Sequence, residues 1–187
     1  MNRREALSAV TIIMGGTIIG AEAFLTGCSP RKKNVEGPLL TEKDINLLNE
    51  VGETILPHTN SSPGAKEANV GEFMKTFIND CYTDKEQKIF VDGLSKLNLA
   101  SDMQYAKGFT QLDARQKEEL LLALEKEAAE TRKQNHPDIH YYTMIKQLTL
   151  TGFLTSEVGA TKALRHVAVP GRYEGCIPLQ PGEKAWG

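Results

Sequence analysis

The stretch from Lys146 to Cys176 constrains the fold most, because its character changes at Val167. The residues before that point carry an apolar pattern that predicts one face of a helix: Leu148, Phe153 and Leu154. They are followed by small residues, which let another backbone come close: Ser156, Gly159, Ala160 and Ala163. Beyond Val167, prolines and glycines interrupt every stretch that could form a helix, so residues 167–187 are expected to be an extended, irregular tail.

Apolar side chains recur along this expected tail: Val169, Tyr173, Ile177, Leu179 and Trp186. A segment without regular structure cannot build a core of its own, so these side chains need a surface on which to pack. Two alternatives are open. The tail folds back on its own domain, or it lies on another protein, which would make residues 167–187 a partner-binding segment.

Helix-start signals divide the middle of the chain into short helices. Three pairs have the spacing of an N-cap residue and the third residue of a helix: Thr41 with Asp44, Thr83 with Glu86, and Asp113 with Gln116. Pro57 and Pro137 mark breaks, and no alternating strand pattern competes with the helical spacing. The sequence therefore predicts an all-α fold, a compact bundle of five or six short helices within residues 41–166.

Apolar stripes in two of these helices define part of the expected core. The helix before Thr83 carries one stripe: Phe73, Met74, Phe77, Ile78 and Cys81. The helix after Asp113 carries four leucines and then a mostly charged stretch that is expected to face solvent: Leu120, Leu121, Leu122 and Leu124, followed by 125–134. With 40% hydrophobic residues over 187 positions, the chain can bury one modest core, which favours a single domain.

The first residues have the features of a targeting segment. Arg3 and Arg4 precede an uncharged run from Ala6 to Ala21, whose glycines make it only mildly hydrophobic and which is short for a membrane-spanning helix. A cleaved signal peptide fits this pattern better than a permanent anchor. The paired arginines resemble a twin-arginine signal, which exports proteins already folded. An ordinary secretory leader with two basic residues is the alternative.

Leu25-Thr26-Gly27-Cys28 resembles a bacterial lipobox at the end of that apolar run. In this interpretation residues 1–27 are removed as a lipoprotein signal peptide and Cys28 carries the lipid. Several acyl chains give stable anchoring, and the polar residues 28–40 then form a lipidated tether. The expected location is the periplasmic side of the cell envelope.

Cys81 and Cys176 remain as the two thiols and are candidates for a disulfide in an oxidising compartment. Three outcomes are open. A bridge between them requires α-carbons within about 7 Å. A bridge from Cys176 to a partner would hold the tail in place. Both thiols free is the third outcome, since a buried free cysteine is common.

Few patterns in the chain point to chemistry. The formal charge of −2 without a basic face argues against nucleic-acid binding. No G-x-G-x-x-G follows a strand and no C-x-x-C-H occurs, so dinucleotide binding and covalent haem attachment are not indicated. His136 and His140 could face a metal from one helix, but Pro137 interrupts the spacing and no third ligand is indicated. A hydrolase that uses Ser156 or His58 lacks partner residues at a defined spacing. No catalytic, cofactor-binding or metal-binding residue is therefore expected.

Four stretches resemble the gluconate 2-dehydrogenase subunit 3 family: Ile55–Thr59 with Ser62–Ala65, Gln147–Thr149, Thr155–Ala160 and Val169–Cys176. The similarity covers most of Thr41 to Trp186 and is densest in the C-terminal third. A twin-arginine leader is also typical of this family, whereas the lipobox is not universal in it.

The resemblance implies a small, cofactor-free subunit that is not an enzyme by itself. The partner would be a large FAD-dependent dehydrogenase of the glucose-methanol-choline oxidoreductase (GMC) type, which commonly passes electrons to a cytochrome c. The small subunit would assist the export, maturation and stability of the large one. The substrate stays open among sugars, sugar acids, polyols and glycosides. A stand-alone envelope lipoprotein that acts as a scaffold or binding protein is the alternative.

The expected partner interface lies in the C-terminal third: Thr155, Ser156, Glu157, Arg165, Pro170, Arg172, Tyr173 and Trp186. Within it, Glu157 and Arg165 are expected to make polar contacts.

Overall fold

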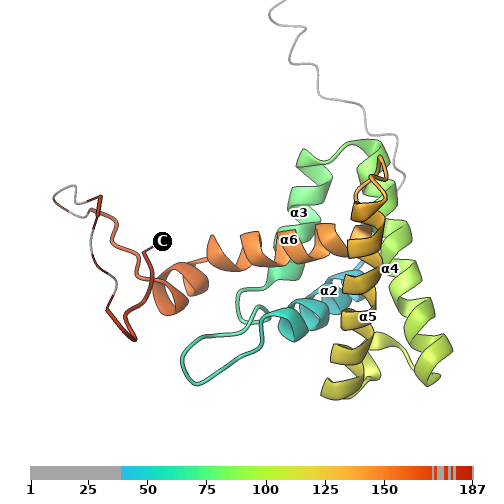
Figure 1. Ribbon diagram of the computed structural model, residues 1–187, viewed down its shortest axis with the longest axis horizontal. Coiled ribbons are helices and arrows are strands. Elements are labelled where there is room, and N and C mark those ends of the chain that lie inside the picture. Colours follow the sequence, from blue (N-terminus) through green and yellow to red (C-terminus); the bar gives the residue numbers. More distant parts are fainter. Residues whose placement is uncertain (1–38, 170, 172–174, 177, 179, 187) are drawn as a thin grey trace, which may run out of the picture. The chain divides into compact units, whose positions relative to one another are not determined.

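The computed structural model describes residues 39–169, 171, 175–176, 178 and 180–186. Over these residues the chain is helical (Figure 1), and the elements are α2 (Glu42–Ile55), α3 (Val70–Cys81), α4 (Asp84–Tyr105), the 3₁₀ turn η1 (Phe109–Gln111), α5 (Ala114–Lys133), α6 (Tyr141–Leu154) and the π-helical turn η2 (Gly159–Ala163). Within the described part no strand forms, and one isolated bridge joins Arg165 to Trp186. The all-α prediction is confirmed.

No helix in the described part of the chain is both long enough and apolar enough to cross a membrane. Six residues with predicted roles lie outside the described residues: Arg3, Arg4, Cys28, Pro170, Arg172 and Tyr173.

Each predicted helix start is a capping box. The Thr41 hydroxyl accepts a hydrogen bond from the Asp44 N–H, at 3.4 Å, while the Asp44 carboxylate accepts one from the Thr41 N–H, at 2.8 Å. The same reciprocal bonds close the other two predicted pairs: Thr83 with Glu86 and Asp113 with Gln116. These bonds satisfy backbone donors that a helix start otherwise leaves without partners.

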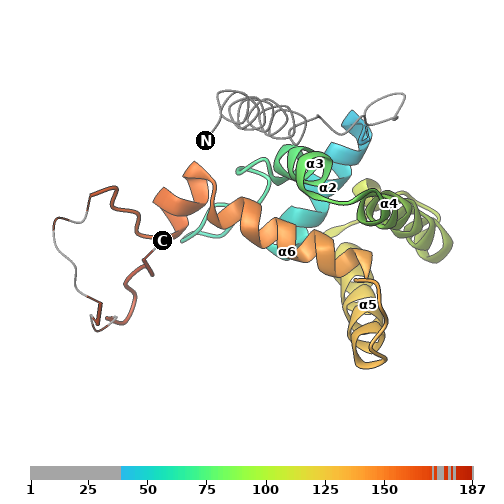
Figure 2. The same cartoon turned by 90° about the horizontal axis from the view of Figure 1, so that it is seen from above.

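Helix α6 is the centre of the bundle. It packs against α2, α3, α4 and α5, and Figure 2 shows it running between α3 and α5. Its buried residues occupy more than one face: Tyr141, Tyr142, Met144, Ile145, Leu148, Thr149, Gly152 and Phe153. A surface helix buries a single stripe, so this pattern identifies α6 as a core helix. Among them, Thr149 is fully buried, and its hydroxyl donates to the Ile145 carbonyl at 2.8 Å.

Helices of the bundle approach one another closely at glycines. A Cβ atom on Gly152 of α6 would lie 2.6 Å from the Phe73 ring of α3. A Cβ atom on Gly52 of α2 would lie 2.7 Å from a methyl group of Val70. Because glycine has no side chain, backbones can approach more closely at these positions than any other residue would allow.

Three residues expected in the core are exposed instead. Leu122 and Leu154 are 54% and 42% exposed, and Cys81 is also exposed. Cys81 and Leu154 are the last residues of α3 and α6, where the helices extend past the neighbours that cover their middles. Leu122 lies on the outer side of α5. The other members of the two predicted stripes are buried or half-buried: Phe73, Met74, Phe77, Ile78, Leu120, Leu121 and Leu124.

The turn-rich segment after α2 is fixed by the carboxylate of Glu53. This carboxylate accepts hydrogen bonds from the backbone N–H groups of His58, at 2.9 Å, and Lys66, at 2.8 Å. Gly64 lies against it, since a Cβ atom at Gly64 would come within 2.2 Å of Glu53 Oε1. One carboxylate thus closes the loop by binding its two ends.

Candidate partner-binding site

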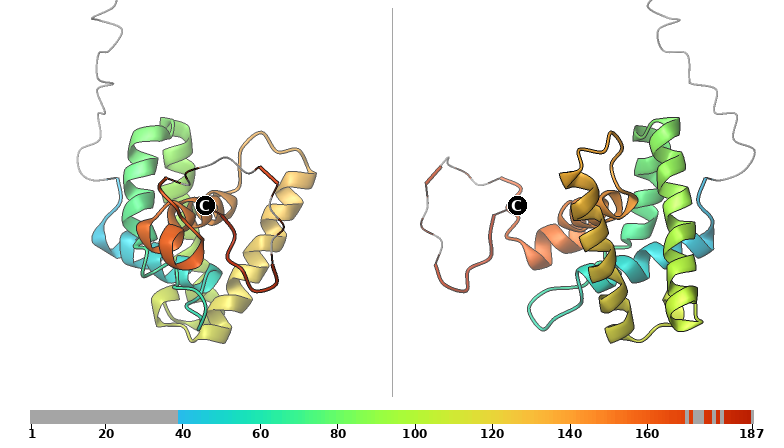
Figure 3. Two further views of the ribbon diagram at one scale, coloured as in Figure 1. Left: turned by 90° about the vertical axis from the view of Figure 1, so that its left-hand side faces the viewer. Right: turned by 45° about the vertical axis from the view of Figure 1, so that its right-hand side comes forward.

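The predicted interface residues that the structure describes begin where α6 gives way to η2, at the end of the bundle facing the viewer in the left panel of Figure 3. Thr155 caps α6. The Ser156 hydroxyl donates to the Phe153 carbonyl, at 2.7 Å, and accepts from the Gly159 N–H, at 2.9 Å. Ser156 therefore stabilises the junction between two helical segments, and both of its hydrogen bonds are to the backbone.

Gly159 lets this junction turn sharply. A Cβ atom at Gly159 would come within 1.9 Å of the Phe153 carbonyl oxygen. The close backbone approach predicted from the small residues is present, and the approaching backbone is the last turn of α6 itself. Glu157 lies next to this turn and is exposed.

Arg165 makes three kinds of contact with the end of the tail. Its N–H donates to the Ala185 carbonyl at 2.8 Å. Its Nη1 atom lies 2.5 Å from Glu183 Oε1, and its guanidinium carbon lies 4.2 Å from the centroid of the Trp186 ring. We call Arg165, Glu183, Ala185 and Trp186 the clasp.

The clasp supports the first alternative for the end of the tail, while exposed residues of the tail leave the second alternative open. Residues 183–186 fold back on their own domain, so the charge of Arg165 is paired with Glu183 of the same chain. Val169 remains 82% exposed, however, and Val167 and Trp186 are 42% and 47% exposed. Exposed apolar side chains also occur on α4, α5 and α6, but these three residues belong to the segment after η2, where they are available to a protein partner.

Two lysines connect the clasp to the loop after α2. Lys184 Nζ donates to the Lys162 carbonyl, and Lys162 Nζ lies 2.6 Å from Glu67 Oε1. The hydrogen bond from Lys162 lowers the pKa of Glu67 below its usual value. His58 Nδ1 lies 3.9 Å from the same carboxylate. The loop after α2, η2 and the end of the tail therefore form one surface, which we call the C-terminal face.

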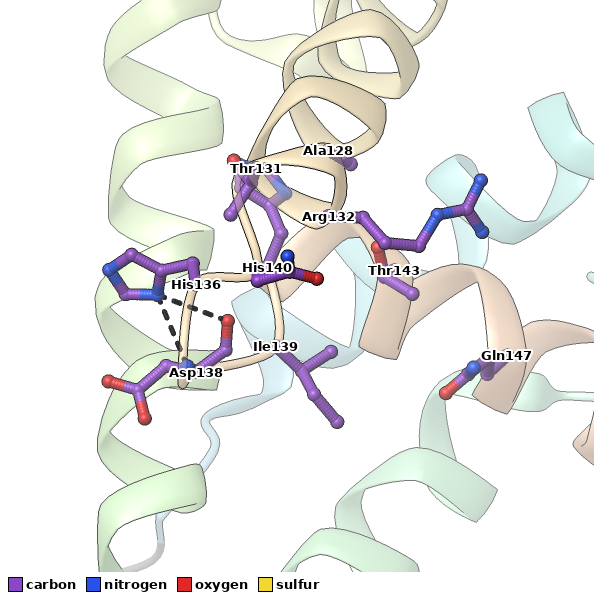
Figure 4. A pocket seen from close by; sticks show the side chains of 10 residues that line it. Ala128, Thr131, Arg132, His136, Asp138, Ile139, His140, Thr143 and Gln147 are labelled. Carbon is purple, nitrogen blue, oxygen red and sulfur yellow. Dashed lines mark hydrogen bonds between the residues drawn. The ribbon is translucent and has the colours of Figure 1, made fainter.

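A pocket of about 440 Å³ lies between the second half of α5 and the start of α6 (Figure 4). It contains His136 and His140, but these do not converge on one point. His136 Nδ1 accepts from the Asp138 N–H at 3.1 Å. His140 caps α6 by accepting from the Tyr142 N–H at 3.3 Å, and its Nε2 atom lies 3.4 Å from Glu127. In the described part of the chain no cluster of three His, Cys, Asp or Glu residues could hold a metal ion.

Cys81 and Cys176 are both free and exposed. The structure therefore has no bridge between these two residues. A disulfide from Cys176 to a partner stays a prediction.

Sequence reasoning missed the clasp partners Glu183 and Ala185 and the supporting residues Lys162 and Glu67. One signal in the sequence could have indicated the clasp. Arg165 and Glu183 have opposite charges, and the only tryptophan of the chain, Trp186, lies close to Glu183 in the sequence. The separation of Arg165 from these two residues along the chain hides the clasp, because no helical or strand period relates them.

Comparison with protein-family models matches residues 42–171 to one described as gluconate 2-dehydrogenase subunit 3. The match runs from the start of α2 past Arg165 and ends at Gly171. It therefore includes the whole helical bundle and leaves out the clasp partners Glu183 and Trp186. Searches among curated proteins and among solved structures gave no match.

Proposed function

The chain belongs to the gluconate 2-dehydrogenase subunit 3 family, and on this premise we propose that it is the non-catalytic small subunit of an FAD-dependent dehydrogenase complex. The family name implies association with the other subunits of a dehydrogenase complex. In this proposal a large flavoprotein of the GMC type holds the FAD, and a cytochrome c subunit accepts the electrons. The substrate class is that of sugars, sugar acids or glycosides.

The observation that carries the proposal is the C-terminal face. It belongs largely to the region that matches the family, and the segment that follows η2 carries two exposed apolar residues, Val167 and Val169. The Glu53 carboxylate and the Lys162–Glu67 pair hold the segments of this face together. A rigid surface with exposed apolar side chains binds a protein partner at a lower entropic cost than a flexible one.

Purification from the native membrane tests the proposal. A tag placed within residues 29–37 alters none of the residues that form the C-terminal face. Solubilisation in a mild detergent, followed by capture on the tag, is expected to recover a large flavoprotein with bound FAD in a fixed ratio to this chain. Recovery of the chain alone would contradict the proposal and favour a stand-alone envelope lipoprotein.

A role in export is supported by Arg3 and Arg4, which precede the apolar run. A large subunit that lacks its own signal crosses the membrane with this chain if the two bind before export. Replacing both arginines with lysine is expected to retain both proteins in the cytoplasm. Export of the flavoprotein in that variant would refute the carrier role.

Membrane attachment is proposed to occur through lipid on Cys28. The Cys28→Ser variant is expected to leave the membrane fraction with its fold unchanged, while the Cys81→Ser control stays with the membrane. A Cys28→Ser protein that still fractionates entirely with membranes would show that another attachment dominates.

A further inference from the structure

We propose that Arg165 is a positioning residue for partner binding. Together with Glu183 it holds the Trp186 side chain in place, so the large subunit meets a tryptophan that is already positioned against Arg165. This inference rests on the proposed function, because it concerns how the C-terminal face meets the flavoprotein.

Three different parts of Arg165 act on three different parts of the tail. The backbone N–H of Arg165 binds the Ala185 carbonyl and so holds Ala185 beside Arg165. The guanidinium group binds the Glu183 carboxylate through Nη1, and its carbon lies over the Trp186 ring. Arginine can do all of this at once because its planar group combines hydrogen-bond donors at its edge with a face that stacks on aromatic rings.

Glu183 is itself held in place by a turn. Its Oε2 atom accepts from the Gln180 N–H, at 3.2 Å, and its own N–H donates to the Gln180 carbonyl, at 3.0 Å. Gly182 has φ +82° in this turn, a conformation that glycine adopts without strain. The carboxylate that orients Arg165 is therefore not a freely rotating surface group.

The clasp leaves a large aromatic surface available to a partner. Trp186 is 47% exposed although one face of its ring lies on the guanidinium. Tryptophan is among the residues that contribute most to the affinity of protein interfaces. A side chain that is ordered before binding loses less conformational entropy on association. Holding Trp186 in place thus favours binding without any contact between Arg165 and the partner.

The rest of the C-terminal face supports the clasp. Lys184 binds the Lys162 carbonyl and Lys162 binds Glu67, so the end of the tail is tied to η2 and, through it, to the loop after α2. Each of these exposed contacts is weak alone. Together they offset the entropic cost of closing the loop between Arg165 and Trp186. This cost grows only slowly with the length of the loop.

The fluorescence of Trp186 reports the clasp directly, because the chain contains one tryptophan. In the isolated full-length mature chain, Arg165→Gln is expected to lower the anisotropy of this fluorescence and to raise its quenching by acrylamide about twofold. Arg165→Lys keeps a charge for Glu183 but loses the planar group that stacks, so an intermediate value is expected. The matched control is Arg115→Gln, which removes another exposed arginine from a pair, here with Glu119 at 2.9 Å.

The same variants are then examined in the complex captured from membranes. Arg165→Gln is expected to raise the rate at which the flavoprotein dissociates from the immobilised chain roughly five- to tenfold, as loss of a stacked cation and an ion pair predicts. Arg115→Gln is expected to leave this rate unchanged. Circular dichroism of each variant verifies that the helical bundle is intact.

Three results would overturn the inference, and they differ from one another. Equal quenching of wild type and Arg165→Gln would show that no clasp exists. Altered quenching with an unchanged dissociation rate would show that the clasp does not position Trp186 for the partner, and the proposed function would stand. If the wild-type chain retains no flavoprotein, the proposed function fails and the inference with it, whatever the fluorescence shows.

Discussion

Gly93 of α4 lies against the ring of Tyr141 in α6, since a Cβ atom at Gly93 would come within 2.3 Å of Tyr141 Cγ. Tyr141 is buried, with 6% of its surface exposed, and it cannot move away without leaving the core. The absence of a side chain at Gly93 therefore sets how closely α4 approaches the central helix.

Replacing Gly93 with alanine is expected to lower the free energy of unfolding by about 1–3 kcal/mol, the usual cost of overpacking a core. This expected loss already includes the gain of roughly 1 kcal/mol that alanine has over glycine in the interior of a helix. Denaturation by urea measures the change. The control is Gly108→Ala, where no atom lies within 4 Å of the added Cβ and φ is −65°. A Gly93→Ala protein as stable as this control would refute the close contact.

Glu50 joins α2 to α5 and to the loop after α2. Its carboxylate lies 2.8 Å from Lys117 Nζ and also binds Lys66. Burial raises the pKa of Glu50, but the hydrogen bonds from Lys117 and Lys66 outweigh this effect and hold its pKa below the usual 4.5. Because the pKa is lower in the folded state, ionised Glu50 stabilises the fold above about pH 4.5. This contribution is lost as the pH falls through the lowered pKa.

Glu50→Gln is therefore expected to lower the free energy of unfolding by about 1–2 kcal/mol at pH 7, as for other hydrogen bonds to charged groups. The difference from wild type should shrink below about pH 4. Denaturation at a series of pH values measures it. Glu130→Gln removes an exposed partner of Lys133 and should cost less than about 1 kcal/mol. A loss for Glu50→Gln that is the same at pH 3 and pH 7 would contradict this account.

Two neighbouring tyrosines resist ionisation. Burial raises the pKa of both Tyr141 and Tyr142 to about 12, against about 10 in an unfolded chain. The raised pKa means that their contribution to stability is fully present below pH 10 and is lost as the pH rises towards 12.

An ultraviolet titration of the folded protein should consequently show two of the five tyrosines ionising only near pH 12 or on unfolding. Tyr142→Phe should remove one of these two late transitions. Ionisation of all five tyrosines in a single step near pH 10 would show that the pair is accessible to water.

The two cysteines provide a test of the disulfide prediction. Because Cys81 and Cys176 are free and exposed, both should react readily with a thiol reagent in the isolated folded chain. In the native complex we expect Cys176 to be bridged to the large subunit. Non-reducing electrophoresis would then show a band that combines both proteins, lost in Cys176→Ser and kept in Cys81→Ser. Separate bands without reductant would rule the bridge out.

The helix starts could be predicted from sequence because the bonds that make them are local. Thr41 and Asp44 are three residues apart, and their reciprocal hydrogen bonds need no other part of the chain. The same is true of the break at Pro137, where α5 has ended and α6 has not begun.

Burial at the helix ends and on the outer side of the bundle could not be predicted in the same way. Leu121 and Leu122 are adjacent leucines, yet Leu121 is 5% exposed and Leu122 54% exposed. Which one is buried depends on the rotation of α5 against its neighbours. The contact of Arg165 with Trp186 likewise depends on the path of the chain between them, which no periodicity describes.

The position of α6 late in the chain also affects when the core can form during synthesis. Within the part of the chain that the structure describes, α6 packs against each of the other α-helices and is also the last α-helix to be synthesised. Until α6 is made, helices α2 to α5 lack the helix against which all four of them pack. Shortening the chain from its C-terminus into α6 would therefore remove buried residues that contact all four other described α-helices, and we expect such a chain to lose its packed core.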